Sequence, residues 1–254
     1  MAIITFTSDF GYRDHYIAAV KAKIFNLNSN VTVTDISHGI NHYDVAHAAF
    51  VVRSVFRDFP KGTVHLLAVN TLDRYNSDLV AVKLEDHYFV GADNGLITLI
   101  SDQNPTAIVT LRKDAVTVFP EKDVLSRAAV FLASEKAIYD LGEKRPELVR
   151  MLNREMRVKE DGIQGNVIHV DHYGNLITNI SKEAFEAAKG ERRFTVKVGR
   201  EHIGVISDAY SRFDEGDCAV VFNDLGLLEI AINKGDASQL LGLRYDSPVS
   251  VQFT

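Results

Sequence analysis

The sequence predicts an α/β protein: a mostly parallel sheet flanked by helices, followed by a smaller, mainly antiparallel β-barrel or sandwich. Up to about residue 145, apolar runs alternate with stretches of helical periodicity, which is the pattern of a parallel sheet covered by helices. The polar segment 145–162 ends this alternation, and short apolar runs with a single short helix follow it. We therefore expect two domains, residues 1–150 and residues 163–254.

The first part alternates strands and helices in order along the chain. Its expected strands are residues 2–6, 31–36, 64–69, 79–84, 88–91 and 107–111. Its expected helices are residues 15–25, 44–56 and 126–141. The second of these helices has one apolar face, formed by Val45, Ala48, Ala49, Val52 and Phe56, as expected for a helix packed on a sheet.

The second part has the pattern of an antiparallel β-domain. Its expected strands are residues 166–170, 194–198, 202–206, 218–222, 228–232 and 248–253. One short helix, residues 181–189, begins at Ser181, a residue type favoured as an N-cap. Short strands separated by polar turns favour a small barrel or sandwich.

The composition excludes several classes of protein. Hydrophobic residues make up 46% of the 254 residues, which is ample for packed cores. We expect no membrane span and no signal peptide, because the required apolar stretches are missing. One cysteine, Cys218, and a net charge of −6 without a basic block favour a cytoplasmic protein that does not bind nucleic acid.

Two aspartates follow the first expected strand. Residues 7–14 read T-S-D-F-G-Y-R-D, and the carboxyl ends of parallel strands form the ligand-binding edge of such sheets. Asp9 is expected at the strand tip, Gly11 in the turn, and Asp14 where a helix N-cap is expected. Both aspartates are candidate ligand-binding residues, and the alternative is that they only cap the helix.

Further polar clusters interrupt the apolar runs. They are residues 35–38 (D-I-S-H), 91–95 (G-A-D-N-G), 171–175 (D-H-Y-G-N) and 223–226 (N-D-L-G). The last two are also typical of ordinary hairpin turns. His38, His42 and His47 do not form a helical i, i+4 pair in a clear metal setting, so we expect no metal site.

Taken together and in order, six stretches resemble the fluorinase, chlorinase and S-adenosylmethionine hydroxide adenosyltransferase family. They read T-S-D-F-G-Y-R-D-H-Y, D-I-S-H-G-I-N-H-Y-D-V-A-H-A-A, F-P-K-G-T-V-H, G-A-D-N-G-L-I, V-D-H-Y-G-N-L-I-T-N-I and L-G-L-L-E-I-A-I-N. The resemblance covers nearly the whole chain. It implies a homotrimer in which S-adenosylmethionine lies between the first domain of one subunit and the second domain of its neighbour.

The resemblance also implies roles for residues of the first domain. Asp9 would accept hydrogen bonds from the two ribose hydroxyls, for which a carboxylate is suited. Tyr43 would present an aromatic face to the ribose and the cationic sulfur, and Phe119 would form another wall.

In the second domain the resemblance implies a site for the methionine part and for adenine. Asp171 and Asn175 would bind the methionine part, with the carboxylate on its ammonium group. Tyr173 and Tyr210 would flank this part of the ligand or stack on adenine, and Asn233 would read the adenine edge. S-adenosylmethionine would be a substrate, so no cofactor is expected.

The chain departs from the family pattern where the hydrolytic members handle water. Asn70 stands at the position of an aspartate in a V-D-P-G-type segment, and Pro120 at the position of a histidine in an F-H-G-R-D-type segment. Neither residue can act as a base. Asp73 and Arg74 are candidate replacements if this loop has shifted by a residue, and the alternative is a solvated loop. The candidate catalytic positions are therefore Asn70, Asp73 and Arg74.

Two hypotheses follow from these residues. The first is an enzyme that attacks the ribose C5′ of S-adenosylmethionine with water and forms adenosine and methionine. The second is a protein that binds S-adenosylmethionine or adenosine but has lost turnover. Halide use, as in some relatives of this family, is a further alternative that no feature of the sequence demands. We favour the enzyme.

Overall fold

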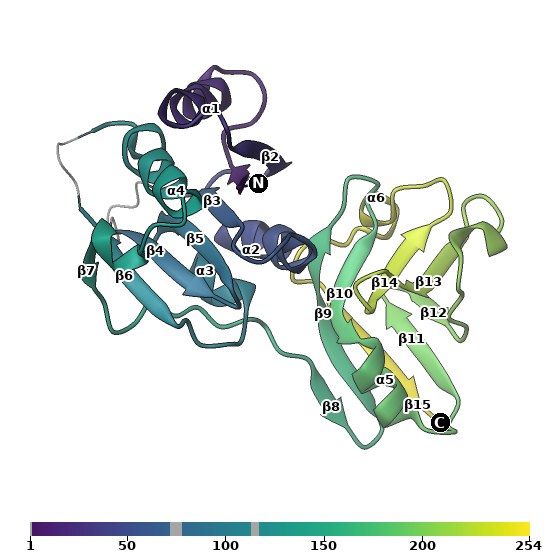
Figure 1. Cartoon of the computed structure of the whole chain (residues 1–254). Coiled ribbons are helices and arrows are strands. Elements are labelled where there is room, and N and C mark those ends of the chain that lie inside the picture. The colour runs from purple at the N-terminus through teal and green to yellow at the C-terminus, as the bar shows by residue number, and fades with distance from the viewer. Residues whose placement is uncertain (1, 72–77, 113–116) are drawn as a thin grey trace. The chain divides into compact units, whose positions relative to one another are not determined.

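The computed structural model describes residues 2–71, 78–112 and 117–254 of the chain (Figure 1). Asp73 and Arg74 lie outside these described residues. The chain divides into two compact units, residues 1–152 and residues 153–254. Each unit has its own hydrophobic core, and the two are described separately below.

The first unit is built on one mixed sheet. Its strands are β1 (Ile3–Ser8), β2 (Thr32–Ser37), β3 (Val64–Ala68), β4 (Leu79–Leu84), β5 (His87–Ala92), β6 (Ala107–Leu111) and β7 (Gly142–Lys144). In the described part of the chain they pair in the order β2-β1-β3-β5-β4-β6-β7. The pairs among β2, β1, β3 and β5 are parallel, and those from β5 to β7 are antiparallel.

Helices cover both faces of this sheet. They are α1 (Tyr16–Leu27), α2 (Val45–Arg53), α3 (Leu96–Ile100) and α4 (Ser126–Ala133), with short turns η1 (Phe56–Asp58), η2 (Glu121–Leu125) and η3 (Ile138–Leu141). Successive side chains of β3 point to opposite faces of the sheet. Leu66 packs in the cluster that contains α1 and α4, while Leu67 packs in the cluster that contains α2 and α3. Burial on both faces explains why these strands are continuous apolar runs.

The expected helices exist, although two are shorter than predicted. Helix α2 begins after Asp44, whose carboxylate accepts the His47 N–H at 2.9 Å. It ends at Arg53, and Phe56 is buried from the separate turn η1. Helix α4 ends at Ala133, although the periodicity extends to residue 141. The α/β class predicted from the sequence is confirmed.

The second unit is an antiparallel, barrel-like sheet. Its strands are β8 (Arg157–Lys159), β9 (Gly162–Val170), β10 (Leu176–Ser181), β11 (Phe194–Val198), β12 (Glu201–Ile203), β13 (Cys218–Phe222), β14 (Leu227–Ile232) and β15 (Pro248–Phe253). They pair in the order β12-β11-β15-β9-β10-β14-β13, and β8 also pairs with β9. The short helices are α5 (Lys182–Lys189), α6 (Ala237–Leu241) and the turn η4 (Tyr210–Arg212).

The core of the second unit lies between this sheet and α5. Phe185 of α5 is 1% exposed and contacts Phe194, Phe222 and Phe253 edge-on. The helix begins at Ser181, whose hydroxyl accepts the Ala184 N–H at 3.2 Å. The predicted Ser N-cap and the predicted antiparallel domain are therefore both confirmed.

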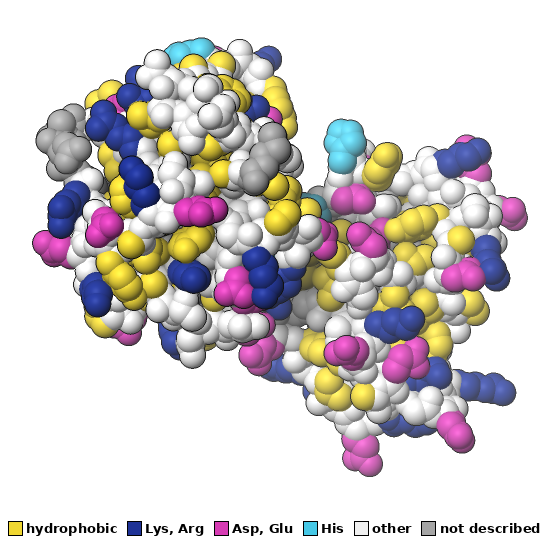
Figure 2. Space-filling view, viewed as in Figure 1, with side chains coloured by type: hydrophobic (Ala, Val, Ile, Leu, Met, Phe, Trp, Pro, Cys, Tyr) yellow, Lys and Arg dark blue, Asp and Glu magenta, His cyan; other side chains and the backbone are white. Residues whose placement is uncertain are grey.

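The face of the protein drawn in Figure 2 is mixed in charge. Figure 2 shows acidic and basic side chains interspersed on the face in view, without a large patch of either sign. Among the described helices, none combines the length and the apolar character that crossing a bilayer requires.

Candidate functional site

The parallel half of the first sheet gathers polar residues at one edge. Asp9 follows β1, His38 follows β2, Asn70 lies just beyond β3, and Asn94 lies just beyond β5. Because these four strands are parallel neighbours, their carboxyl ends meet at the same edge of the sheet. This is the edge at which open α/β sheets bind ligands.

The Asp9 carboxylate connects three loops at this edge. Its Oδ2 atom accepts the Tyr43 N–H at 3.0 Å and the Asn70 N–H at 3.3 Å. Tyr43 and Asn70 both have left-handed backbones, with φ of 64° and 47°, a conformation that non-glycine residues rarely adopt. The structure thus brings together three of the residues singled out in the sequence. Within the described residues, the Asp9 Oδ1 atom has no hydrogen-bond donor.

Asn94 fixes the loop that carries Asn70. Its side-chain amide donates to the Val69 carbonyl at 2.9 Å and to the Asn70 carbonyl at 3.2 Å. Its own Oδ1 accepts the Leu96 N–H at 3.2 Å, at the start of α3. The Asn-Gly segment predicted as a turn also begins a helix, since Gly95 has a φ of 91° and leads directly into α3.

An aromatic cluster lies beside Asp9. The Phe119 ring is 6.0 Å from the Phe10 ring and 5.6 Å from the Tyr16 ring, measured between centroids. Phe10 is the next residue after Asp9, so the segment that contains Phe119 packs on the β1–α1 loop. The structure thus places Phe119 in the same region as Asp9.

Asp14 does not cap the helix, which corrects one of the two expectations for this residue. The N-cap position of α1 is His15, which makes no side-chain capping hydrogen bond. Asp14 is exposed and forms no ion pair or side-chain hydrogen bond in the described part of the chain. The helix begins one residue later than a cap at Asp14 requires, so the carboxylate is not engaged by the helix amides.

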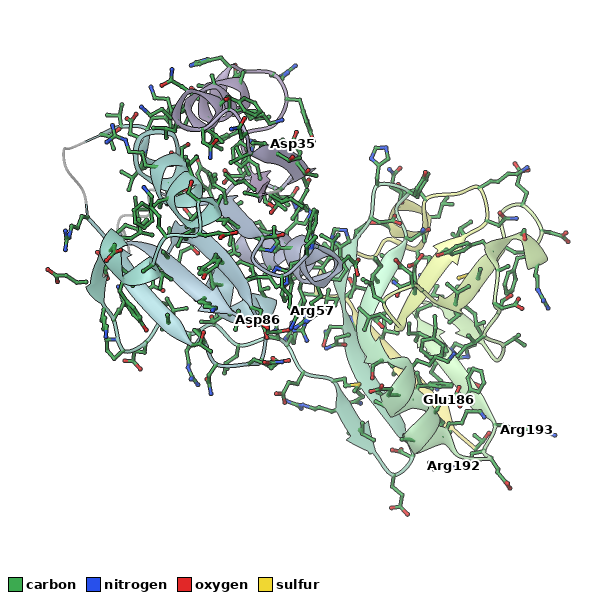
Figure 3. The ribbon with its side chains drawn as sticks, viewed as in Figure 1. Asp35, Arg57, Asp86, Glu186, Arg192 and Arg193 are labelled. Carbon is green, nitrogen blue, oxygen red and sulfur yellow. The ribbon has the colours of Figure 1, made fainter. Side chains whose placement is uncertain are left out.

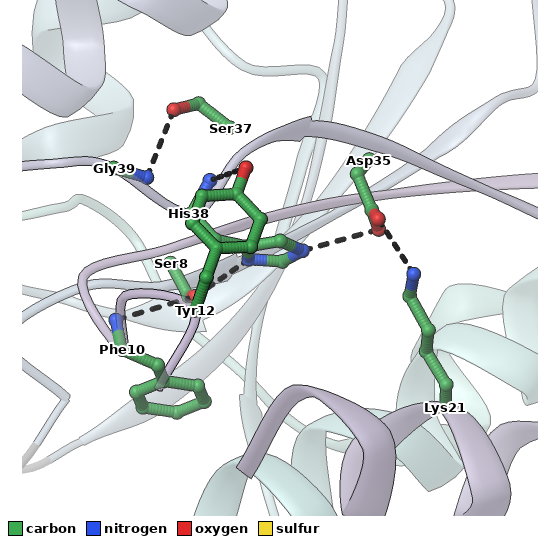
Figure 4. Close-up of polar contacts among 8 residues, drawn as sticks. All are labelled: Ser8, Phe10, Tyr12, Lys21, Asp35, Ser37, His38 and Gly39. Atoms are coloured by element: carbon green, nitrogen blue, oxygen red, sulfur yellow. Dashed lines mark hydrogen bonds and ion pairs between the residues drawn. The ribbon is translucent and has the colours of Figure 1, made fainter. Parts of the chain in front are cut away.

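A buried chain of polar side chains supports the β1–α1 loop (Figure 4). Ser8 Oγ lies 2.7 Å from His38 Nδ1, and His38 Nε2 lies 3.1 Å from Asp35 Oδ1. Asp35 Oδ2 in turn accepts from Lys21 Nζ of α1 at 2.6 Å. Ser8 and His38 are fully buried, and Asp35 lies on β2 beside α1 (Figure 3). These side-chain contacts link β1, β2 and α1, and Ser8 directly precedes Asp9.

The protonation of this chain follows from its surroundings. Burial lowers the pKa of His38, and the Asp35 carboxylate offsets only part of that effect. Burial alone would raise the pKa of Asp35, but hydrogen bonds from Lys21 and His38 hold it below its ordinary value. A neutral imidazole with its proton on Nε2, 3.1 Å from Asp35 Oδ1, accepts at Nδ1 from the Ser8 hydroxyl. His38 is therefore a neutral link and not a free base.

In the second unit, Asp171 orders the loop between β9 and β10. Its Oδ1 accepts the Tyr173 N–H at 2.9 Å and the Asn175 N–H at 2.8 Å. Its Oδ2 accepts from the Asn175 side-chain amide at 3.0 Å. The ordinary turn considered from the sequence is thus present, and Oδ2 keeps capacity for a further donor because a carboxylate oxygen can accept more than one hydrogen bond. Tyr173 is 76% exposed in this loop.

Tyr210 lies in a second polar cluster of this unit. Its hydroxyl donates to Glu229 Oε1 at 2.7 Å, and the Asn223 amide donates to Glu229 Oε2 at 3.0 Å. Burial, followed by the Glu229 carboxylate, raises the pKa of Tyr210 above its ordinary value, and Asp171 and Asp224 add to this effect. Asp171 and Tyr210 are therefore close enough to interact, as a shared ligand site requires.

Asn233 holds the other end of the Tyr210 turn. Its side-chain amide donates to the Phe213 carbonyl at 2.7 Å, immediately after η4. Its Nδ2 is therefore engaged by the protein, while its Oδ1 has no donor among the described residues. An adenine-reading role would use that oxygen.

Three buried titratable residues were not selected as candidate site residues from the sequence. Glu229 is 4% exposed within an otherwise apolar strand, His38 is fully buried, and Glu121 is 7% exposed. An acidic residue within an apolar strand pattern is the signal that points to Glu229. No comparable sequence signal marks Glu121, because its burial depends on the turn η2. The described residues contain no group of three side chains suited to hold a metal ion.

Comparisons with known proteins identify relatives over the whole chain. The profile of the SAM hydroxide adenosyltransferase N-terminal domain matches residues 4–142, and that of the C-terminal domain matches residues 165–250. The (R)-S-adenosyl-L-methionine hydrolase of Methanocaldococcus jannaschii is 29% identical, covering 99% of this chain and 96% of the relative. The (R)-S-adenosyl-L-methionine hydrolase of Thermus thermophilus is 29% identical, covering 98% and 99%.

A solved structure supports the same relationship. An uncharacterized conserved protein from Thermotoga maritima superposes with a TM-score of 0.88 at 27% identity, covering 98% of this chain and 99% of that protein. The resemblance found in the sequence is thus confirmed across both units. The chain belongs to the SAM hydroxide adenosyltransferase family.

Proposed function

We propose that the protein hydrolyses S-adenosylmethionine, with water attacking the ribose C5′ to give adenosine and L-methionine. The observation that carries this proposal is the full-length similarity to two (R)-S-adenosyl-L-methionine hydrolases, each 29% identical. The sheet edge around Asp9 supports it, because this carboxylate is held by two backbone amides and keeps one oxygen for a ligand.

The chemistry makes modest demands on the protein. Attack at C5′ breaks the C5′–S bond, and the electron pair stays on sulfur, so the cationic sulfonium leaves as the neutral thioether of methionine. No general acid is needed for this leaving group. The protein has to align water opposite the C–S bond and exclude competing solvent. S-adenosylmethionine is the substrate, and the proposal requires no further cofactor.

The candidate residues have complementary chemistry for this substrate. In the first unit, Asp9 Oδ1 would accept from the ribose diol, and Tyr43 and Phe119 would offer aromatic faces to the ribose and the sulfonium. Tyr43 is 73% exposed, so its ring is available to a ligand. Asp14 is exposed as well, and we keep it as a candidate binding residue.

In the second unit, the methionine part would bind at the β9–β10 loop. Asp171 would pair with the ammonium group, with Asn175 beside it, and Tyr173 and Tyr210 would flank the ligand. Asn233 would bind the adenine edge through its free oxygen. The closeness of Asp171 to Tyr210, which affects the pKa of Tyr210, supports their joint use.

The proposal includes the assembly and the location of the protein. A homotrimer with shared sites is implied by the family resemblance, and the candidate residues are divided between both units of the chain. A cytoplasmic location is supported by the single cysteine, Cys218, because such a chain does not depend on disulfides for its fold.

A second function is favoured by a specific observation. Asn70 and Pro120 stand where the hydrolytic family pattern has an aspartate and a histidine, and neither can accept a proton. A protein that binds S-adenosylmethionine or adenosine without turning it over is therefore the alternative.

Product analysis separates the two functions. Purified protein is incubated with S-adenosylmethionine, and the products are separated by liquid chromatography with mass detection. We expect adenosine and methionine in equal amounts, with the heavy isotope on the adenosine 5′ oxygen when the water is enriched in heavy oxygen. The Asp9→Asn variant, prepared in parallel, controls for contaminating enzymes. Tight binding of S-adenosylmethionine without adenosine would establish the binding protein instead.

A further inference from the structure

A buried glutamate lies next to the lost histidine position. Glu121 directly follows Pro120 and is 7% exposed. It is the first residue of η2, a π-helical turn in which the Ser126 N–H and the Ser126 hydroxyl both bond to the Glu121 carbonyl. Single π-turns are uncommon and are frequent at functional sites. The backbone at Glu121 is therefore held firmly, at a position where the family pattern has no acid.

The neighbours of Glu121 belong to the candidate site. Phe119, two residues before it, packs on Phe10, which follows Asp9. Thr71 follows Asn70, whose N–H binds the Asp9 carboxylate. Glu121 is close enough to both Asp9 and Thr71 for each to affect its pKa. Its carboxyl group is thus within electrostatic range of the residue that is proposed to hold the ribose.

The surroundings of Glu121 increase the affinity of its carboxylate for a proton. Burial raises the pKa of Glu121 above its ordinary value of 4.5, and the negative charge of Asp9 raises it further. The Glu121 backbone N–H and the Thr71 hydroxyl lower it in part. In the described part of the chain, no lysine or arginine forms an ion pair with this carboxylate. A carboxylate in such a setting holds protons more strongly than a solvated one.

The charged groups on the elements around this turn do not change that conclusion. Helices α1 and α4 and strand β5 pack against η2. Of the titratable side chains they carry, Lys21 is paired with Asp35. The others are not among the causes of the shifted Glu121 pKa: Tyr16, Lys23, His87, Tyr88 and Arg127. Among the described titratable groups, Asp9 is the one whose charge does.

We propose that Glu121 is the general base that takes the proton from the attacking water in this protein. The inference rests on the proposed hydrolysis of S-adenosylmethionine. As the water oxygen bonds to C5′, the C5′–S pair moves to sulfur and one water proton passes to the Glu121 carboxylate. Adenosine and neutral methionine sulfur result, and Glu121 later releases the proton to solvent. The base thus comes from a new position in the turn that has lost its histidine.

Steady-state kinetics of three variants tests this role. Glu121→Gln keeps the shape of the side chain but cannot accept a proton, so we expect kcat to fall by about 10²–10⁴-fold with KM nearly unchanged. Glu121→Asp keeps a displaced carboxylate and should retain an intermediate rate. Asp123→Asn is the matched control, since Asp123 is a partly exposed carboxylate in the same turn that bonds Thr117. It should keep the wild-type rate.

The pH dependence of kcat gives a second readout. The wild type should lose activity on acidification through a pKa above 4.5, and this acid limb should disappear from the residual activity of Glu121→Gln. Adenosine affinity and the unfolding midpoint show whether each variant is folded. A fold defect in Glu121→Gln leaves Glu121→Asp as the test, with an intermediate rate and a retained acid limb expected.

The outcomes separate this inference from the proposed function. Wild-type protein that forms no adenosine overturns both. If wild type is active and Glu121→Gln has the same rate and the same pH profile, the role of Glu121 as a base is overturned while the proposed function stands. Glu121 would then serve packing, because glutamine mimics the protonated acid. A loss of turnover confined to Asp73→Asn, with Glu121→Gln active, assigns the base to Asp73 and overturns the inference as well.

Discussion

At the scale of single residues, the two carboxylate oxygens of Asp9 differ in their partners. One oxygen binds the Tyr43 and Asn70 amides, and the other has no donor among the described residues. In Asp9→Asn the carbonyl oxygen can keep both amides, whereas the other position becomes a donor and the charge is lost. We expect adenosine binding to weaken by about 1.5–3 kcal/mol, roughly ten- to a hundredfold in Kd, as measured by calorimetry.

The unfolding midpoint of Asp9→Asn distinguishes binding from structure. We expect it to change little, because the two backbone amides keep an acceptor. Unchanged adenosine affinity together with a lowered midpoint would assign Asp9 to holding the loops alone.

At the scale of elements, β1, β3 and β5 share a buried histidine pair far along the strands from Asp9. His65 Nδ1 lies 2.7 Å from Thr5 Oγ1, and His65 Nε2 lies 3.1 Å from His87 Nδ1. Asp86 directly precedes His87, and Figure 3 shows Arg57 beside it. Burial, followed by the charge of His87, lowers the pKa of His65 to about 3. The folded protein therefore holds this imidazole neutral.

This pair predicts a loss of stability in acid. Between pH 6.5 and about 3, the unfolded chain binds a proton that folded His65 excludes, so stability falls as the pH drops. Each such proton changes the free energy of unfolding by about 1.4 kcal/mol per pH unit. Denaturant unfolding at several pH values gives the free energy of unfolding at each pH. This free energy should fall less steeply with decreasing pH in His65→Gln than in wild type. The exposed His42→Gln variant should match wild type, and equal slopes in all three would contradict this account.

Elements differ in how well the sequence predicts them. Strand β1 and helix α2 are predictable because burial on two faces leaves an apolar run, and because Asp44 with a periodic apolar face begins a helix. Helix α3 is not, since its five residues are too few to show periodicity. The π-turn η2 has no sequence signature that distinguishes it from the start of α4.

The candidate site was predictable in its residue types but not in its connections. Asp9 is identified by its place after a strand, yet its partners Tyr43 and Asn70 lie 34 and 61 positions further along the chain. Only the sheet order brings those loops together. The burial of Glu121 likewise depends on tertiary packing, so its raised pKa cannot be read from the residues around it in the sequence.

At the scale of the whole molecule, the division of candidate residues between two units has a testable consequence for assembly. Asp9 and Asp171 belong to different units of the chain. If each site combines the first unit of one subunit with the second unit of its neighbour, mixed trimers of Asp9→Asn and Asp171→Asn subunits contain some intact sites. At a substrate concentration too low to saturate either weakened variant, we expect the mixture to be more active than either variant alone when the two are unfolded together and refolded.

Light scattering and the single variants provide the controls for this experiment. Wild type should be a trimer, and each variant refolded alone should keep its lowered activity at that substrate concentration. A monomer that binds S-adenosylmethionine at micromolar concentration, or a mixture no more active than its parts, would exclude shared sites.

The amides that bind Asp9 have a consequence for the thermodynamics of the proposed nucleoside binding. Tyr43 and Asn70 hold left-handed backbones that would relax in a free loop, and Asn94 pins the second of these loops. The entropy lost in ordering these segments is therefore spent when the chain folds and not when the nucleoside arrives. If the ribose binds at Asp9 as proposed, such preorganisation leaves the ligand's own loss of freedom as the main opposing cost, and the affinity depends on the folded sheet edge as a whole.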